Sequence, residues 1–154
     1  MNITELKERS DISEDVKLSR IYTQLQELIK ELKQRELPDE IVETINKDVE
    51  ELNSTSLVGK ELRKLTKQKQ TNILFILMKK LKIVPKNHYR IMWMALGMSV
   101  FGFPIGIAYG AALGNVGLFP TGVGFGMVIG LILGKRIDKK AFEEGRQLGV
   151  EIKY

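Results

Sequence analysis

Residues 91–134 read IMWMALGMSVFGFPIGIAYGAALGNVGLFPTGVGFGMVIGLILG, and this stretch decides the fold of the chain. It contains no Asp, Glu, Lys, Arg or His over 44 residues, and it holds 11 of the 14 glycines. A helix needs ~20 predominantly apolar residues to cross the hydrocarbon core of a bilayer. The stretch is therefore long enough for two spans and a tight turn, and it predicts a transmembrane helical hairpin.

The two predicted spans cover about residues 91–113 and 116–134. At ~1.5 Å per residue the first span is about 35 Å long, which is enough to cross with some tilt. Pro104 removes a helix hydrogen bond and predicts a kink in that span, and residues 115–117 predict the turn. Counted from Pro120, the second span has only 15 uncharged residues. A hairpin that enters the membrane without fully crossing it is therefore the structural alternative.

Glycines repeat every four residues in both spans. In a helix each set forms a nearly continuous stripe without side chains, along which two backbones can approach closely and gain dispersion contacts in lipid. Gly97 and Gly124 lie outside the two registers. The predicted helix-packing residues are Gly102, Gly106, Gly110, Gly114, Gly122, Gly126, Gly130 and Gly134.

At these residues the chain resembles the glycine-zipper membrane proteins, which are small bacterial and organellar hairpins. The resemblance covers residues 102–134, roughly a fifth of the chain. It implies close helix packing. It implies no single activity, because such proteins include envelope proteins, assembly factors and oligomeric pores. The overall layout also resembles bacterial two-span proteins with a helical cytoplasmic head.

Basic residues flank the uncharged stretch on both sides. Residues 57–90 carry 10 basic and one acidic side chain, and residues 135–154 carry six and four. Because Lys and Arg stay on the cytoplasmic side, the chain is predicted to cross a bacterial inner membrane twice with both termini in the cytoplasm. A nucleic-acid partner is not expected, since the basic region runs directly into a span. The predicted membrane-interface residues, several facing anionic headgroups, are Lys79, Lys80, Lys82, Lys86, Tyr89, Arg90, Trp93, Lys135 and Arg136.

The polar region before the spans, residues 13–84, predicts a helical head. Residues 1–12 are predicted to be flexible, and Asp11 with Glu14 resembles a capping box that begins a helix at Ser13. The apolar seam of this helix, a predicted partner surface, consists of Leu18, Ile21, Leu25, Leu28 and Leu32. Because the seam is short for an independent coiled coil, packing inside one chain as an antiparallel pair is an equal alternative to dimerisation.

Two further helices complete the predicted head. One begins at Pro38, and the other covers residues 57–84 and is stopped by Pro85. Residues 73–78 are six apolar residues in a row, followed by lysines, which is typical of a helix lying in the headgroup region. The alternative is that the apolar residues of this segment close a three-helix core.

The residue types exclude several kinds of chemistry. The chain has no cysteine, which excludes disulfides, thiolate nucleophiles and cysteine zinc sites. His88 is the only histidine, and it stands at the predicted membrane edge rather than beside a second ligand or a catalytic partner. We therefore expect no enzyme activity, no cofactor and no metal site.

These patterns predict an all-α chain with a helical cytoplasmic head, a basic juxtamembrane linker at residues 85–90, the transmembrane hairpin and a cytoplasmic tail at residues 135–154. The expected function is that of a non-enzymatic membrane anchor and helix–helix assembly or scaffold module. Its expected partners are the lipid bilayer, itself or another membrane protein through the glycine stripes, and a cytoplasmic protein through the head. The alternatives are an oligomeric channel or membrane-permeabilising protein, and a lipid-binding or membrane-shaping protein that uses residues 73–90.

Overall fold

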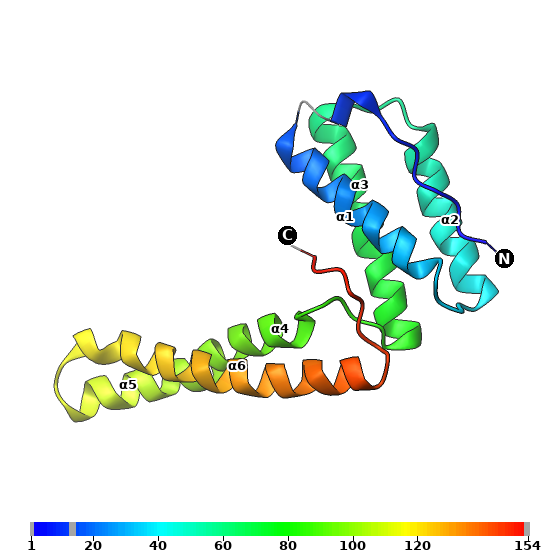
Figure 1. Ribbon diagram of the computed structural model, residues 1–154. Helices are drawn as coiled ribbons and strands as arrows, with labels where there is room; N and C mark the ends of the chain where they lie inside the picture. Colours follow the sequence, from blue (N-terminus) through cyan, green and yellow to red (C-terminus); the bar gives the residue numbers. More distant parts are fainter. Residues whose placement is uncertain (1, 13–14, 153–154) are drawn as a thin grey trace. The chain divides into compact units, whose positions relative to one another are not determined.

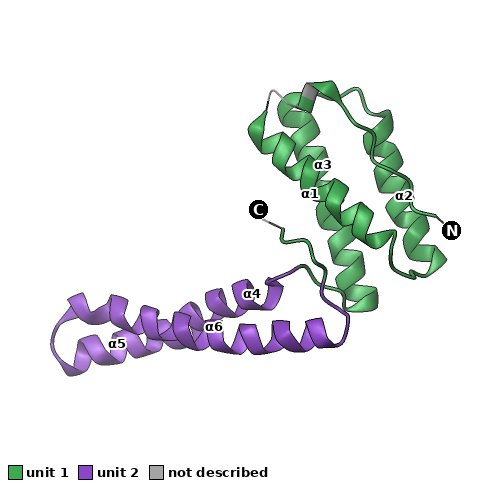
Figure 2. Cartoon of the chain, viewed as in Figure 1, with its two compact units in different colours: residues 1–85, 148–154 green, residues 86–147 purple. Residues whose placement is uncertain are grey.

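The computed structural model describes residues 2–12 and 15–152, and every regular element in these ranges is helical, as predicted. The chain divides into two compact units (Figure 2). Unit 1 comprises residues 1–85 and 148–154, and unit 2 comprises residues 86–147. The chain leaves unit 1 and re-enters it at neighbouring points, since the Leu148 N–H donates to the Val84 carbonyl at 2.8 Å.

Unit 1 contains three main helices, in which α1 and α2 both pack against α3 (Figure 1). Its elements are the 3-10 turn η1 (Ser10–Ile12), α1 (Val16–Leu32), α2 (Asp39–Ser54), α3 (Gly59–Ile76) and a π-helical turn, η2 (Leu77–Leu81). The core is built from fully buried Leu and Ile side chains of all three helices, which alternate with exposed polar residues at helical spacing.

The predicted partner seam lies inside this core. Leu18, Leu25, Leu28 and Leu32 are fully buried within the chain, and Ile21 is partly exposed. The prediction that the seam is a surface for a second protein is therefore wrong, and packing inside one chain is the correct alternative. A seam of this length buries its apolar area most readily against the two helices already tethered to it.

The end of α3 also belongs to the core. Ile73 and Leu77 are fully buried and Leu81 is partly buried, so the three-helix-core interpretation holds for this segment. The helix ends at Leu81, three residues earlier than the predicted end at Val84. Lys82 adopts a left-handed conformation, with φ of 55°, and thereby stops the helix before the proline does.

A single aspartate begins α1. The Asp15 carboxylate accepts hydrogen bonds from two backbone N–H groups of the first turn, at 2.9 and 3.1 Å, and α1 starts at Val16. The predicted start, Ser13, lies outside the described residues. Of the predicted capping box, Glu14 and the Asp11 side chain lie outside the described residues.

A polar cluster joins α2 to α3. The buried Asp48 accepts hydrogen bonds from Lys69 at 3.0 Å and from Asn72 at 2.6 Å, and Lys69 also pairs with Glu51. Burial alone would lower the pKa of Lys69, but the hydrogen bonds to Glu51 and Asp48 outweigh it and raise the pKa above its usual value. The cluster fixes how the two helices align, because every group in it has a specific partner.

Part of the N-terminal segment that was predicted to be flexible, residues 2–7, lies along α2. Ile3 and Leu6 are buried, and two asparagines of α2 bind the extended backbone. The four hydrogen bonds join Asn46 to Thr4 and Asn2, and Asn53 to Lys7 and Glu5, at 2.7–3.1 Å. Seven helical residues rise ~10.5 Å, and three extended residues span about 10 Å. The distance between the two asparagines along α2 therefore matches the distance between the backbone groups that they bind.

The predicted tail at residues 135–154 is not one segment. Its first part belongs to the last helix of unit 2, α6 (Phe119–Glu143). Residues 148–152 return to unit 1, where Leu148 and Ile152 are buried in the core. Two backbone N–H groups between them donate to the Glu31 carboxylate at 2.9–3.3 Å.

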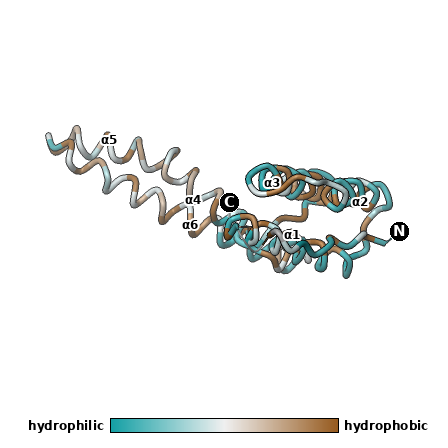
Figure 3. Tube along the Cα trace, turned by 90° about the horizontal axis from the view of Figure 1, so that it is seen from above, coloured by the Kyte–Doolittle hydropathy of each residue, from teal (hydrophilic) through white to brown (hydrophobic). Residues whose placement is uncertain are grey.

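Unit 2 is a helical hairpin. Its elements are α4 (His88–Leu96), the π-helical turn η3 (Gly97–Gly102), α5 (Phe103–Ala112), the 3-10 turn η4 (Val116–Leu118) and α6 (Phe119–Glu143). The first three form one continuous helix of 25 residues, and α6 runs back along it (Figure 1). Both arms are long and apolar enough to cross a membrane, by length and composition. Figure 3 shows the apolar colouring along both arms, whereas hydrophilic colouring is concentrated in the first three helices.

The turn predicted at residues 115–117 is present, and a proline stands at the start of the second arm. The Asn115 side chain accepts a hydrogen bond from the Gly117 N–H at 2.9 Å, and Pro120 lies in the first turn of α6, where its missing N–H costs nothing. Pro104 lies immediately after the π-helical turn, where the Phe103 N–H donates to the Met98 carbonyl five residues back instead of four. The wider turn gives the proline ring room beside the preceding carbonyls.

Candidate functional site

The two arms of the hairpin meet along a face made of glycine backbones. On α6 the four glycines at spacing four are all buried. A Cβ atom added to any of them would lie under 3.0 Å from the opposite backbone, a distance that real Cβ atoms essentially never show. A Cβ on Gly122 would lie 2.7 Å from the Gly102 oxygen, and one on Gly126 would lie 2.7 Å from the Gly102 Cα. A Cβ on Gly130 would lie 2.8 Å from the Trp93 carbonyl carbon, and one on Gly134 would lie 2.5 Å from the Arg90 Cα.

The first arm contributes the matching face. A Cβ on Gly102 would lie 2.8 Å from the Val123 Cα, and one on Gly106 would lie 2.5 Å from the Phe119 oxygen. The backbones are therefore in contact wherever these glycines meet, as dispersion-driven packing requires.

Gly97 also lies on this face, although it is outside the four-residue register. A Cβ there would lie 2.9 Å from the Gly130 Cα. Gly97 and Gly102 are five residues apart, and the π-helical turn η3 between them brings both to the same side. The spacing of five next to Pro104 is the signal from which this could have been inferred.

Two predicted packing residues lie elsewhere. Gly110 is buried, but a Cβ there would make ordinary contact, at 3.5 Å, with the Asn115 oxygen in the turn rather than with α6. Gly114 has a φ of 60°, and a Cβ added to it would have no neighbour within 4 Å, because the helix ends at Ala112. The prediction that Gly114 packs against a helix is therefore wrong. It serves the turn, where the left-handed conformation favours glycine.

A buried carboxylate closes the base of the hairpin. Asp138 follows Gly134 by four residues on α6 and is only 7% exposed. Its two oxygens accept hydrogen bonds from the N–H groups of Tyr89 and Arg90, at 3.1 and 2.9 Å. These are the second and third residues of α4, whose own N-cap residue Asn87 makes no side-chain cap. Asp138 thus caps the first arm from the second. The sequence analysis missed it, although it continues the register of the α6 glycines.

Large apolar side chains point away from this face. The exposed large side chains on the two arms include Val100, Phe101, Phe103, Ile107, Tyr109, Phe125, Val128, Ile129 and Ile132. The hairpin therefore has its smallest residues inside and its largest apolar residues outside. Water-soluble monomers rarely expose an apolar surface of this extent.

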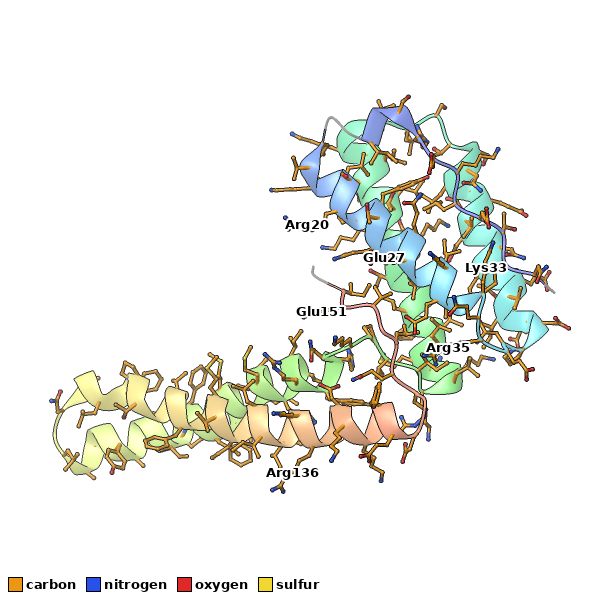
Figure 4. All side chains as sticks on the ribbon, viewed as in Figure 1. Arg20, Glu27, Lys33, Arg35, Arg136 and Glu151 are labelled. Carbon is orange, nitrogen blue, oxygen red and sulfur yellow. The ribbon has the colours of Figure 1, made fainter. Side chains whose placement is uncertain are left out.

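The predicted interface residues of unit 2 lie near the base of the hairpin. Lys86, Arg90, Lys135 and Arg136 are exposed, and Tyr89 and Trp93 are partly exposed. Arg136 projects from α6 on the side away from α4 (Figure 4). The exposed charges thus lie at the base of the hairpin, next to the apolar part of each arm.

The other predicted interface residues belong to unit 1. Lys79, Lys80 and Lys82 are exposed around η2. The Lys79 ammonium lies 5.7 Å from the centre of the Phe75 ring, and Lys80 forms an ion pair with Glu40 at 3.2 Å. The nine predicted interface residues are therefore divided between the two units.

Comparison with protein-family models, with curated proteins and with solved structures finds no match for this chain. Its function has to be argued from geometry. In residues 2–12 and 15–152, no group of three or more His, Cys, Asp or Glu side chains is arranged to hold a metal ion.

The polar side chains of the apolar arms are engaged locally. Ser99 donates to carbonyls of its own helix at 3.1 and 3.2 Å, and Thr121 donates to the Leu118 carbonyl at 2.5 Å. Glycine backbones offer shape and close contact but no reactive group. What this arrangement can do is hold two helices together and leave their outer faces apolar.

Proposed function

We propose that the chain is an integral membrane anchor whose hairpin packs as a glycine zipper and whose helical head lies in the cytoplasm. The observation that supports it is the inverted distribution of residue size in the hairpin, with glycines between the helices and large apolar side chains outside. In water each exposed Phe or Ile would forgo ~1.5–3 kcal/mol of burial. In lipid the same side chains are already solvated by hydrocarbon.

The dimensions of the hairpin suit this proposal. The helix from residue 88 to 112 has 25 residues, about 37 Å in length, against a hydrocarbon core of ~30 Å. The uncharged part of α6 is shorter. Lys135 and Arg136 follow it directly, and their long side chains can extend to the headgroups while the helix continues.

The proposed orientation follows from charge. The turn carries no charged residue, whereas lysines and arginines cluster at the other end of both arms. We propose that in the bacterial inner membrane both termini lie in the cytoplasm and the turn on the opposite side, since Lys and Arg favour the cytoplasmic side. Anionic headgroups are the proposed contacts of the basic residues at the base.

Assembly with other membrane proteins was expected to use the glycine stripes, and a different surface is proposed here. Because the glycine face is filled by the second arm of the same chain, we propose that partner spans or further copies bind the outer apolar faces. A channel built on the glycine stripes would need a glycine face directed at a neighbouring subunit. No observation favours that alternative over the anchor.

The absence of cysteine allows a direct test of membrane topology. Val116→Cys places a thiol at a position that is 85% exposed in the turn, and Thr23→Cys places one on an exposed position of α1. In intact cells a membrane-impermeant maleimide should label the first variant, and it should label the second only after lysis. The protein should also remain in membranes washed with alkaline carbonate. Labelling of Thr23→Cys in intact cells would refute the orientation, and release by carbonate would refute the anchor.

A further inference from the structure

A groove between α1 and α3 in unit 1 concentrates positive charge. It has a volume of about 620 Å³, and apart from the partly exposed Ile21 its lining is entirely basic. The basic residues are Lys17, Arg20, Lys60, Arg63, Lys64 and Lys67. No described acidic residue lines it. Of the six cations, Arg63 pairs with the Asp15 carboxylate at 3.3 Å, and Asp15 also caps α1.

The cluster is a product of the fold. Residues 1–56 carry 14 acidic and 8 basic side chains, so α1 belongs to a net acidic part of the chain. The α1 and α3 residues of the groove are about 40 positions apart in the sequence. On α3, Lys60 and Lys64 stand at i,i+4, an arrangement of like charges that destabilises a helix. Helix stability alone therefore does not account for this cluster.

The start of α3 adds to the positive potential. Lys60 lies in the first turn of this 18-residue helix together with the exposed Glu61, and the N-cap residue Val58 provides no side-chain acceptor. The N-terminal end of a helix carries a partial positive charge. The first turn of α1 differs, because Asp15 caps it. The groove thus combines six cationic side chains with the positive end of one helix dipole.

We propose that this groove binds an anion carrying two or more phosphate groups. Guanidinium groups such as that of Arg20 bind phosphate oxygens in a bidentate manner, and lysines add compact charges around them. The volume falls within the range of small-molecule sites, ~300–1,000 Å³. Ile21 offers apolar contact to the organic part of such a ligand. Two sources share this chemistry, a free polyphosphate compound and a phosphorylated lipid headgroup. Because the groove lies wholly in unit 1, the proposal is independent of the membrane anchor.

The test uses the full chain in dodecyl maltoside, an uncharged detergent, and inorganic tripolyphosphate as the probe in calorimetric titrations. The groove variant is Arg20→Gln/Lys64→Gln, which leaves Arg63 and its ion pair intact. The control is Lys30→Gln/Lys47→Gln, which removes two exposed cations of unit 1 outside the groove. Far-UV circular dichroism monitors the fold of both.

The wild-type chain and the control should bind with one saturable site, and the groove variant should bind at least about tenfold more weakly, because two charge-assisted contacts are lost. Equal weakening in both variants, or no saturable binding by the wild type at 150 mM salt, would overturn the proposal.

A second arm separates the two sources. The chain is placed in nanodiscs of phosphatidylcholine alone or with 20% cardiolipin, a lipid with two phosphate groups, and tripolyphosphate is titrated again. If the ligand is a lipid headgroup, cardiolipin should compete and weaken binding to the wild type. If the ligand is a free anion, both nanodiscs should give the same affinity. Either result requires the groove to bind tripolyphosphate. Unchanged binding of tripolyphosphate by the Arg20→Gln/Lys64→Gln variant would contradict the proposal.

Discussion

The two units pack their helices together in opposite ways. In unit 1 large side chains such as Leu25 and Ile45 fill the space between helices, and polar residues lie outside. In unit 2 the helix backbones contact each other at Gly122 and Gly126, and the large side chains lie outside. Removing apolar area from water drives the first arrangement. In lipid that force is absent between helices, so close backbone contact has to replace it.

This difference implies opposite responses to a change of residue size. Unit 1 should be damaged by loss of volume inside, whereas unit 2 should be damaged by a gain of a single carbon atom inside. Large residues outside unit 2 should tolerate truncation far better than those inside unit 1. The following substitutions test these expectations in order of decreasing effect.

The largest effect is expected from a cavity in unit 1. Leu25→Ala should lower the free energy of unfolding of unit 1 by ~2–5 kcal/mol, because the side chain is fully buried. The matched change in unit 2, Ile107→Ala, removes a side chain that is 63% exposed and should change the stability of the hairpin little. Amide hydrogen exchange of α1 and of α4 measures the two units separately. Similar losses for the two variants would contradict the contrast in packing.

Asp138→Ala should have the next largest effect, confined to unit 2. It leaves the N–H groups of Tyr89 and Arg90 without their acceptor, at a cost of ~1–3 kcal/mol. Exchange of those two amides should accelerate, whereas the adjacent exposed variant Lys139→Ala should leave them protected. Unchanged protection in Asp138→Ala would show that the cap contributes nothing to the hairpin.

A smaller effect is expected where an asparagine holds the N-terminal segment. Asn53→Ala removes two hydrogen bonds to exposed backbone groups, so a loss of ~1 kcal/mol is expected. Trypsin should then cleave after Lys7 about fivefold faster, while the exposed control Ser56→Ala should be cleaved at the wild-type rate. Equal rates for all three proteins would mean that the hydrogen bonds of Asn53 do not hold the segment.

The smallest effect is expected from acid. The hydrogen bond from the Leu18 N–H, followed by the one from Lys17 and the nearby Arg63, holds the pKa of Asp15 below its usual value. A group with a lowered pKa stabilises the fold above its unfolded pKa of about 3.8 and loses that contribution as the pH falls through the folded value. The urea midpoint of unit 1 should therefore fall between pH 5 and pH 3. Asp15→Asn should show a smaller fall, and an identical fall would exclude Asp15 as a contributor.

Features encoded by neighbouring residues could be predicted from the sequence. The uncharged stretch at 91–134 gave two apolar helices, and Asn115 and Pro120 marked the turn and the start of α6. Oppositely charged residues four positions apart on α6 form ion pairs, Lys139 with Glu143 at 3.6 Å and Lys140 with Glu144 at 3.9 Å. In each case the signal lies within about four residues of its effect.

Features that join distant segments could not be predicted in this way. Whether the seam at residues 18–32 packs inside or outside the chain depends on what the other helices offer. The N-terminal segment is held by Asn46 and Asn53, more than 40 residues away. Gly97 entered the packing face only through a π-helical turn, which shifts the register by one residue. Asp138 acts on backbone groups almost 50 residues earlier.

The most direct test of close packing in the hairpin is the comparison of Gly126→Ala with Gly124→Ala. The two sites are two residues apart on α6. A Cβ on Gly126 would lie 2.5 Å from the Gly102 nitrogen, whereas one on Gly124 has no neighbour within 4 Å. Trp93 is the only tryptophan and lies in α4, so its fluorescence reports thermal unfolding of the hairpin in detergent. Gly126→Ala should lower the midpoint, and Gly124→Ala should keep or raise it, since Ala favours a helix by up to ~1 kcal/mol over Gly. Midpoints that move together in the same direction would contradict packing through the glycine face.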